Sequence, residues 1–239
     1  MLTFVYSYYR NTTMFQLQQR VWNDYHIDKD IVQVIVTDDC SPEEEAIEKA
    51  IITPKYPNMR VFKILKKVPW NWLECRNIGA HYAENDWILL TDMDHVVSYM
   101  AIQRILEEIP HLSYWDVHQF TRVRPDGTPY KPHNDSFLIS KDLFWKCGGY
   151  DEHYSGLYGT SGMFKRRLLS FAVNVKTLQI PLILYGRHVV LDASTTDFPR
   201  KENRDPNAIQ KRSLTSPGIE LHFQQPYTEL VFDGSSSGN

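Results

Sequence analysis

The 239-residue chain is 42% hydrophobic and 23% charged, with a formal net charge of −3. This length and composition are sufficient for one sizeable core, and they favour a single α/β domain with an appended C-terminal segment. The nearly balanced charge gives no general attraction to nucleic acid or to anionic lipid.

The three cysteines, Cys40, Cys75 and Cys147, are odd in number and show no CxxC spacing. This pattern argues against a disulfide framework or a zinc knuckle and favours a reducing compartment, so we expect a cytoplasmic protein. The N-terminal apolar stretch is too short for a signal sequence, and no window approaches the ~20 apolar residues of a membrane span. We therefore expect no membrane-spanning segment.

Strand and helix signals alternate at short spacing through the first half, which is typical of an α/β fold with a mostly parallel sheet. Apolar runs predict strands at 2–7, 31–37, 60–65 and from 87 onward. Helices are predicted between these strands. The first has Met14, Leu17, Val21 and Tyr25 on one face, and the second has Ser41 as N-cap, Pro42 at its first position and Glu44 closing a capping box. The third runs from about Leu73 to Ala83, and the fourth runs through Ile102 to Ile109 and can be capped by Ser98.

The second half has a different pattern. Residues 114–140 predict strands joined by a Pro-Asp-Gly turn, followed by a short helix that ends at Gly148 and Gly149. Residues 159–172 predict another helix and 175–188 another strand. The charged, proline-containing stretch from Thr195 to Ser216 predicts a loop, and the last seven residues predict an unstructured tail.

Two of the predicted strands end in pairs of carboxylates. Asp38 and Asp39 follow the second strand, and Asp92 and Asp94 follow the fourth. The alternative is that these residues cap helices, but Ser41 and Ser98 already occupy the expected cap positions. Ligands bind outside the carboxyl ends of strands in open α/β sheets, and a DxD arrangement suits Mg²⁺ or Mn²⁺ shared with a substrate diphosphate. The sequence therefore predicts a metal-assisted diphosphate site here.

Four segments occur in one order: "YSYYRN", "VIVTDDCSP", "ECRNIGAHYAENDWILLTDMDH" and "KCGGYDEHYSGLYG". Together they resemble the family 2-type glycosyltransferases of the GT-A fold, over about residues 2 to 170. That family has an acidic pair followed by a small residue and Ser, an Arg-Asn-x-Gly helix, an apolar strand ending in DxD, and a Gly-Gly-[FY]-Asp-Glu segment.

The resemblance implies a Rossmann-like, mixed, mostly parallel sheet flanked by helices in residues 1–194. The nucleotide-binding half would span about 1–97 and the acceptor-side half about 98–194, with 195–239 as a flexible loop and C-terminal extension. It also implies transfer of a sugar from a nucleotide-diphosphate donor, expected to be a UDP-sugar, with inversion at the anomeric carbon. The acceptor could be a glycan, a lipid-linked saccharide or another hydroxyl-bearing molecule.

Site residues follow from the same resemblance. Asp38 and Asp39 would hold the base and ribose, and Asp92 would contact the ribose, a metal-bound water or the metal itself. Asp94 would bind Mn²⁺ or Mg²⁺, with His188 as a further ligand and His95 as its alternative. Arg76 would approach the diphosphate, although a surface arginine paired with an acid is equally consistent with the sequence. The full nucleotide-sugar site implied is Ser7, Arg10, Asp38, Asp39, Arg76, Asp92 and Met93.

The segment "YGTSGMF" departs from the family pattern. Thr160 and Ser161 stand where the family has an acidic pair that deprotonates the acceptor, and a hydroxyl cannot act as that base unaided. Three explanations are open. Asp151 or Glu152 supplies the base, which we favour; the enzyme retains configuration and needs none; or the chain is a degenerate nucleotide-sugar or carbohydrate-binding module.

Other enzyme classes fit less well. "ILLTDMDHV" matches the hhhhDxDx[TV] pattern of haloacid dehalogenase-like phosphatases, but the later strand ends "LILYGRH" without the acidic pair that this class needs. A dinucleotide oxidoreductase would have GxGxxG after the first strand, where this chain has "YSYYRN". Residues 194–207, with Arg200, Lys201 and Arg204, are predicted to form a lid over the diphosphate or a solvated loop.

Overall fold

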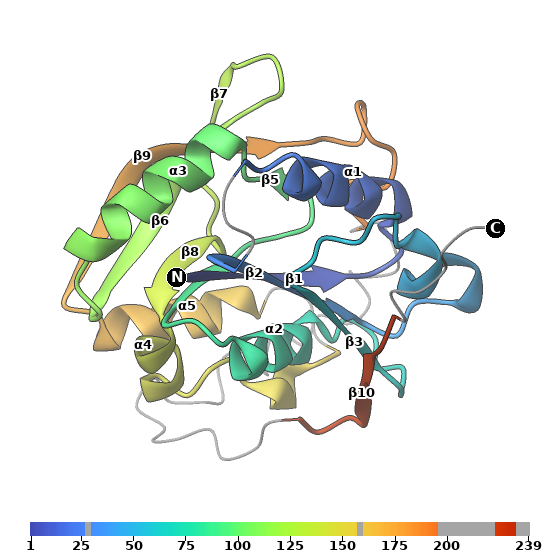
Figure 1. The fold of residues 1–239 in the computed structure, drawn as a ribbon. Helices are drawn as coiled ribbons and strands as arrows, with labels where there is room; N and C mark the ends of the chain where they lie inside the picture. The colour runs from blue at the N-terminus through green and yellow to red at the C-terminus, as the bar shows by residue number, and fades with distance from the viewer. Residues whose placement is uncertain (27–29, 157–159, 196–222, 233–239) are drawn as a thin grey trace.

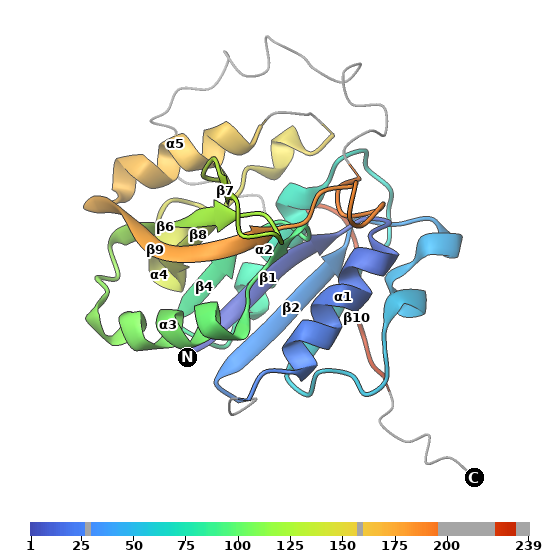
Figure 2. The same ribbon diagram turned by 90° about the horizontal axis from the view of Figure 1, so that it is seen from above.

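The structure is a computed structural model that describes residues 1–26, 30–156, 160–195 and 223–232. In these ranges a mixed sheet forms the middle of three layers, with helices on both faces (Figures 1 and 2). The strands are β1 (Leu2–Tyr8), β2 (Val32–Asp38), β3 (Met59–Ile64), β4 (Trp87–Leu90), β5 (His95–Val96), β6 (Asp116–Val123), β7 (Pro129–Tyr130), β8 (Phe137–Ser140), β9 (Asn174–Leu184) and β10 (Tyr227–Leu230). The α-helices are α1 (Thr12–Asn23), α2 (Trp72–Tyr82), α3 (Tyr99–Glu108), α4 (Lys141–Lys146) and α5 (Ser161–Phe171), and short 3₁₀ turns are η1 (Glu43–Glu45), η2 (Ile47–Ala50), η3 (Ile109–His111) and η4 (Glu152–Tyr154).

The strand order in the described sheet is β10-β3-β2-β1-β4-β8-β6-β9-β5, with β7 paired to β6. The four strands β3, β2, β1 and β4 of the first half are parallel, and β6 and β9 of the second half also pair in parallel. Strand β8 joins β4 in the antiparallel sense, with Phe137 opposite Leu90. Because of this reversal, the loop that precedes β8 reaches the sheet edge where β4 ends.

Both faces of the central strands are covered, which explains their continuous apolar sequence. Alternate residues of β1, such as Phe4 and Tyr6, pack with α1 and α3, whereas Val5 packs with α2, α4 and α5 on the other face. The closest approach is at Gly79 of α2, where an added Cβ would lie 2.3 Å from Val5 Cγ1. Only glycine allows α2 to lie this close to β1.

The prediction of an α-helix after β2 is wrong. This segment forms the 3₁₀ turns η1 and η2, and neither has a side-chain cap. The Asp38 carboxylate accepts hydrogen bonds from the backbone N–H groups of Ser41 (2.8 Å) and Ile47 (3.2 Å), which hold the chain in a wide turn. The Ser41 hydroxyl instead accepts from Arg10 N. In contrast, the expected cap of α3 is confirmed, because Ser98 Oγ accepts from Ala101 N.

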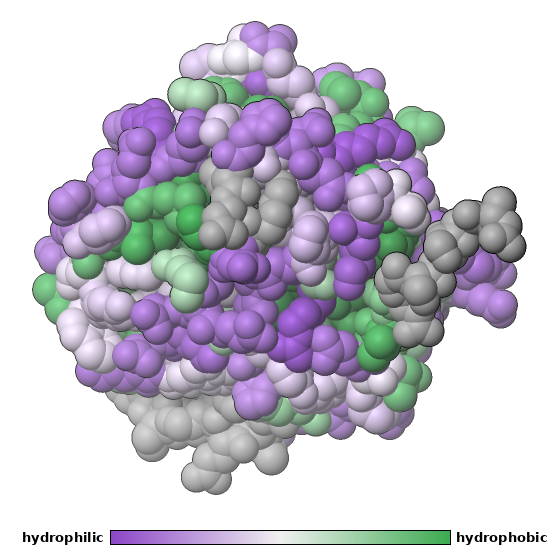
Figure 3. Space-filling model, in the orientation of Figure 1, coloured by the Kyte–Doolittle hydropathy of each residue, from purple (hydrophilic) through white to green (hydrophobic). Residues whose placement is uncertain are grey.

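Strand β10 was not expected from the sequence. It adds to the edge of the sheet beside β3, in the antiparallel sense, and Tyr227 packs against Phe62 and Tyr82. The described face seen in Figure 3 is mainly hydrophilic with scattered apolar areas, as is usual for a folded domain. Within the described residues, no helix has both the length and the apolar character needed to cross a bilayer.

Candidate functional site

The candidate site lies at the edge of the sheet where the parallel strands end. Strands β2, β1 and β4 are neighbours, and their carboxyl ends carry Asp38 and Asp39, Ser7, and Asp92 respectively. The 131–136 loop, which we define as the residues just before β8, and the end of β6 reach the same edge because of the strand directions. This is the position where open α/β sheets bind ligands.

The two aspartates after β2 have different surroundings. Asp38 is buried and spends both carboxylate oxygens on the turn described above. Asp39 Oδ2 accepts from Asn71 N at 2.8 Å, but its Oδ1 is buried without a hydrogen-bond partner in the described part of the chain. Burial raises the pKa of Asp39 well above its usual range, and the neighbouring Asp38 adds to this. Asp39 therefore has a carboxyl oxygen to offer a ligand, whereas Asp38 shapes the turn.

Three other residues expected to bind the nucleotide lie at this edge, and each contacts other residues of the chain. Ser7 Oγ donates to the carbonyl of Trp72 at 3.3 Å. Arg10 pairs with Glu45. Met93 is buried in the core that lies under α1 and α3. Their assignment to the nucleotide stays a prediction.

Asp92 and Arg76 form an ion pair at the end of β4, with Arg76 Nη2 2.5 Å from Asp92 Oδ1. Arg76 also donates to Tyr150 Oη (2.8 Å) and to the carbonyl of Asp135 (2.9 Å), and it packs over the Trp72 ring. It is fully buried, so it is not the surface arginine that the sequence allowed. With both Nη atoms committed to these groups, Arg76 is better placed to orient Asp92 than to reach a diphosphate.

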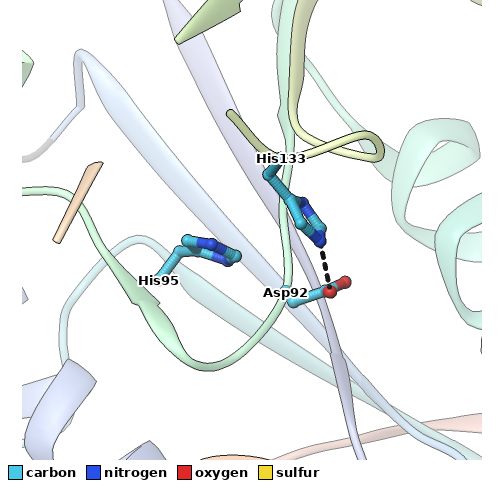
Figure 4. A group of neighbouring side chains, drawn as sticks. All are labelled: Asp92, His95 and His133. Atoms are coloured by element: carbon cyan, nitrogen blue, oxygen red, sulfur yellow. Dashed lines mark ion pairs between the residues drawn. The ribbon is translucent and has the colours of Figure 1, made fainter. Parts of the chain in front are cut away.

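Asp92, His95 and His133 form a group whose possible ligand atoms all lie within 4.8 Å of one another (Figure 4). His133 comes from the 131–136 loop, and its Nε2 lies 3.3 Å from Asp92 Oδ2. Burial lowers the pKa of His133 to about 3, so its imidazole is neutral. Burial alone would raise the pKa of Asp92, but the ion pair with Arg76 opposes burial and lowers it. Because His133 is neutral, Arg76 is the permanent positive charge beside this carboxylate.

Asp94 lies next to this group. Its Oδ1 is buried without a hydrogen-bond partner among the described residues, and it lies 3.0 Å from His95 Nδ1 in a contact that is not a well-aligned hydrogen bond. His188, expected as a metal ligand, is exposed in the turn after β9 and joins no group of three possible ligands in the part of the chain that the structure describes. Of the expected ligands, Asp92 and His95, the alternative to His188, therefore belong to the group of three, which His133 completes, and Asp94 lies beside that group. The assignment of Asp94 and His188 to the metal stays a prediction.

These residues fit a divalent cation. Carboxylate oxygens and a neutral imidazole are suitable donors, and a buried carboxylate oxygen without a partner, such as Asp94 Oδ1, is costly unless a ligand completes it. The combination of oxygen and nitrogen donors favours Mn²⁺ over Mg²⁺, which prefers oxygen ligands and bound water.

The acceptor side contains the carboxylates expected to act as base. Asp151 is buried and accepts from His153 N at 3.2 Å. Glu152 is buried and accepts from Asn77 Nδ2 (2.7 Å) and Gln224 N (3.0 Å). These contacts give both side chains a role in holding the chain, so their surroundings add no support for catalysis, and the base assignment stays a prediction.

The sequence interpretation missed the 131–136 loop. Asp135 is half-buried there, and burial raises its pKa while Arg76 and the nearby Ser161 and Lys165 oppose the shift. Asn134 of the loop accepts from Lys165 Nζ of α5 at 3.1 Å. The only available signal was the position of His133 and Asp135 just before a strand. The proposed lid at 194–207 lies almost wholly outside the described residues.

Comparisons with known proteins point in one direction. A family model described as Glycosyl transferase family 2 matches residues 16–171. TarS from S. aureus in complex with UDP-GlcNAc is similar in structure, with a TM-score of 0.59 and 15% identity over 74% of this chain and 56% of that chain. Another TarS structure gives a TM-score of 0.63 and 14% identity over 80% of this chain and 38% of that one. The mannosyltransferase PcManGT from Pyrobaculum calidifontis, in complex with GDP-Man and Mn²⁺, gives a TM-score of 0.59 and 9% identity over 76% of this chain and 56% of that one.

The chain therefore spans 56% and 38% of the two TarS structures. No curated protein matches the sequence.

Proposed function

The chain belongs to glycosyl transferase family 2, whose model matches residues 16–171, and from this membership we propose that it transfers a sugar from a nucleotide-diphosphate donor to an acceptor hydroxyl. The GT-A fold expected from the sequence is confirmed by the structural similarities. A phosphatase of the haloacid dehalogenase type loses its support, because its resemblance was limited to the segment around β4.

One observation carries the proposal. Asp39 and Asp92 extend from the ends of β2 and β4, on the two sides of β1, at the edge where this kind of sheet binds ligands. Oδ1 of Asp39, which has no hydrogen-bond partner among the described residues, suits the N–H of a nucleotide base when this carboxyl is ionised. The similar TarS and PcManGT structures were solved with UDP-GlcNAc and GDP-Man, which supports a nucleotide-sugar donor without choosing the nucleotide or the sugar.

We propose a metal-dependent reaction in which Asp92, Asp94 and His133 hold Mn²⁺. When bound, such a cation neutralises the charge that develops on the leaving diphosphate. The chain's own residues orient the donor: Arg76 fixes the Asp92 carboxylate from behind, and Asp39 accepts from the base. We expect inversion at the anomeric carbon, with Asp151 or Glu152 as the base that removes the acceptor proton.

The test is a panel of UDP- and GDP-sugars, measured for thermal-shift stabilisation and for release of UDP or GDP, with and without Mn²⁺. We expect stabilisation by one nucleotide series, Mn²⁺-dependent release of its nucleoside diphosphate, and loss of both effects in Asp39→Asn. Glu107→Gln, an exposed change on α3, is the control. If no sugar nucleotide or nucleoside diphosphate stabilises the protein, the proposed donor site is wrong.

A binding module remains a second candidate, favoured by Thr160 and Ser161 in place of the family's acidic pair. The same panel separates the two. A module would be stabilised by a sugar nucleotide and would never turn it over with any acceptor class, whereas a transferase would release the nucleoside diphosphate.

A further inference from the structure

Arg122, at the end of β6, contacts the ring of His95 and the two residues before His133. Its Nη1 lies 2.9 Å from His95 Nε2. Its Nε donates to the carbonyl of Lys131 (2.7 Å) and its Nη2 to that of Pro132 (3.4 Å). The residue is 6% exposed, and its guanidinium packs over the Tyr130 ring. One buried guanidinium thus joins His95 to the two residues that precede His133.

This contact decides which nitrogen of His95 carries the proton. A guanidinium has only donors and keeps its proton in proteins, so a ring nitrogen 2.9 Å from Arg122 Nη1 must be the acceptor. The proton of His95 is then on Nδ1. Because the lone pair of Nε2 accepts the hydrogen bond from Arg122, it is not available to a cation. A cation at Nε2 would also be repelled by the positive charge of the guanidinium.

The other side of the His95 ring meets Asp94. Nδ1 lies 3.0 Å from Asp94 Oδ1, the carboxylate oxygen that otherwise has no partner in the described residues. A proton on Nδ1 therefore lies close to a proposed ligand of the cation, in a contact that a small rotation of either side chain would turn into a hydrogen bond. This is the arrangement in which a histidine orients a ligating carboxylate from outside the coordination sphere.

His133 has the opposite arrangement. Its Nδ1 lies 2.8 Å from Ser136 Oγ, which in turn lies 2.7 Å from Thr91 Oγ1. Both hydroxyls can donate or accept, so Ser136 can accept from Nδ1–H and leave the lone pair of Nε2 directed toward Asp92. Among the described residues no arginine donates to a ring nitrogen of His133, so this imidazole can bind a cation through Nε2.

We propose that Arg122 is a positioning residue of the donor site, which fixes His95 with its proton on Nδ1, excludes Nε2 of His95 from the cation, and leaves His133 as the single imidazole ligand. The group of three in Figure 4 is then a pair of ligands, Asp92 and His133, beside a histidine that orients Asp94. The metal part of this proposal rests on the proposed function, whereas the tautomer of His95 does not.

The first measurement uses the metal-free full chain. Long-range ¹H–¹⁵N NMR distinguishes the two neutral tautomers of each histidine, and His95→Gln assigns its signals. We expect Nδ1–H on His95 in the wild type and in Arg122→Lys, which keeps a donor, and a mixture of tautomers in Arg122→Met, which has none. Arg124→Met is the matched control, because Arg124 is exposed and packs on the same Tyr130 ring without a contact to His95. It should keep the wild-type signals.

The second measurement counts imidazoles on bound Mn²⁺ by electron spin-echo envelope modulation. We expect one nitrogen ligand in the wild type and in Arg124→Met, lost in His133→Gln and kept in His95→Gln. Arg122→Met should weaken Mn²⁺ binding roughly 10- to 100-fold, the usual effect of removing an orienting contact. Two imidazoles in the wild type, or Nε2–H on His95, would overturn the proposal. So would an Arg122→Met protein with an unchanged tautomer.

Failure of the donor site gives a different result. If Mn²⁺ does not bind at all, the metal-dependent part of the proposed function fails, and the tautomer in the metal-free protein still decides the role of Arg122.

Discussion

The Arg76–Asp92 ion pair is buried at one end and open at the other. The guanidinium side chain is 1% exposed and the carboxylate side chain 47% exposed. The arginine therefore faces the core with Tyr150 and the Asp135 carbonyl around it, and the aspartate faces the site. Without its partner, Asp92 would be solvated by water, whereas Arg76 would be left as a buried charge that water cannot reach.

We expect Asp92→Asn to lower the free energy of unfolding by up to about 3 kcal/mol, which is unusual for a residue that faces a ligand. The change leaves Arg76 buried without its counter-charge, and removing one partner of a buried pair is costly, although the two neutral acceptors that remain offset part of the loss. Urea denaturation measures the effect. A variant as stable as the wild type would mean that Arg76 does not depend on Asp92.

We expect Asp94→Asn to have little effect on stability and a large effect on nucleotide binding. Its Oδ1 is buried without a partner among the described residues, so the fold loses little, and we expect the free energy of unfolding to change by less than about 1 kcal/mol. Binding of UDP or GDP in the presence of Mn²⁺ should fall by at least about tenfold, because a ligating carboxylate is lost. Isothermal titration with and without Mn²⁺ measures this. Unchanged affinity would remove Asp94 from the metal site.

Glu74 should make stability depend on pH. Burial raises its pKa to about 7, and hydrogen bonds from Asn71 Nδ2 and Gln225 N only partly oppose this. Because the folded pKa lies above the unfolded value of roughly 4.5, the folded state holds more protons between these values. The free energy of unfolding should then fall as pH rises from 4.5 to 7, by roughly 3 kcal/mol, and stay reduced above pH 7.

Glu74→Gln should remove this component, so the variant gains on the wild type as pH rises from 5 to 8. Urea denaturation at several pH values measures the difference. Glu107→Gln is the control, since Glu107 is exposed on α3. Parallel pH curves for the wild type and Glu74→Gln would show that the pKa of Glu74 is the same in the folded and unfolded states.

Asp151→Asn tests the base. We expect it to lower kcat by roughly 10²-fold while UDP binding stays nearly constant, because a general base acts only once an acceptor is present. Asp135→Asn is the comparison, as this half-buried carboxylate lies near Ser161. Loss in Asp135→Asn with full activity in Asp151→Asn would assign the base to Asp135. Full transfer by both, with the donor's configuration kept in the product, would contradict inversion.

Local sequence signals predicted much of the fold and half of the site. Apolar runs gave β1, β2, β3 and β4 within one or two residues, and Ser98 was a correct cap. The aspartates at the ends of β2 and β4 follow from these strands, because parallel neighbours end at one edge. The helix predicted from Ser41 as N-cap is wrong for a physical reason. The Asp38 carboxylate accepts from the backbone N–H groups of Ser41 and Ile47 and holds this segment in a turn in place of a helix.

The parts that were missed depend on contacts between distant residues. His133 reaches Asp92 only because β8 is antiparallel to β4, and strand direction is not visible in a short apolar run. Arg122 is one of many charged residues until its contact with His95 is known. His188 was chosen by its position after a strand. Strand β9 does end beside the acidic group, with Leu184 opposite His95, but no local pattern could show that the turn after it leaves His188 exposed.

The pairing of β10 with β3 has a consequence for how the protein folds. Strands β1 to β4 can assemble early, but β3 is then an outer strand whose buried Val61, Phe62 and Ile64 alternate with charged Arg60 and Lys63. One edge of β3 pairs with β2, but the main-chain groups on its outer edge gain partners only when Tyr227–Leu230 arrives from far along the sequence. An open strand edge of this kind can recruit another chain, so the interval before β10 docks is the period in which folding competes with aggregation.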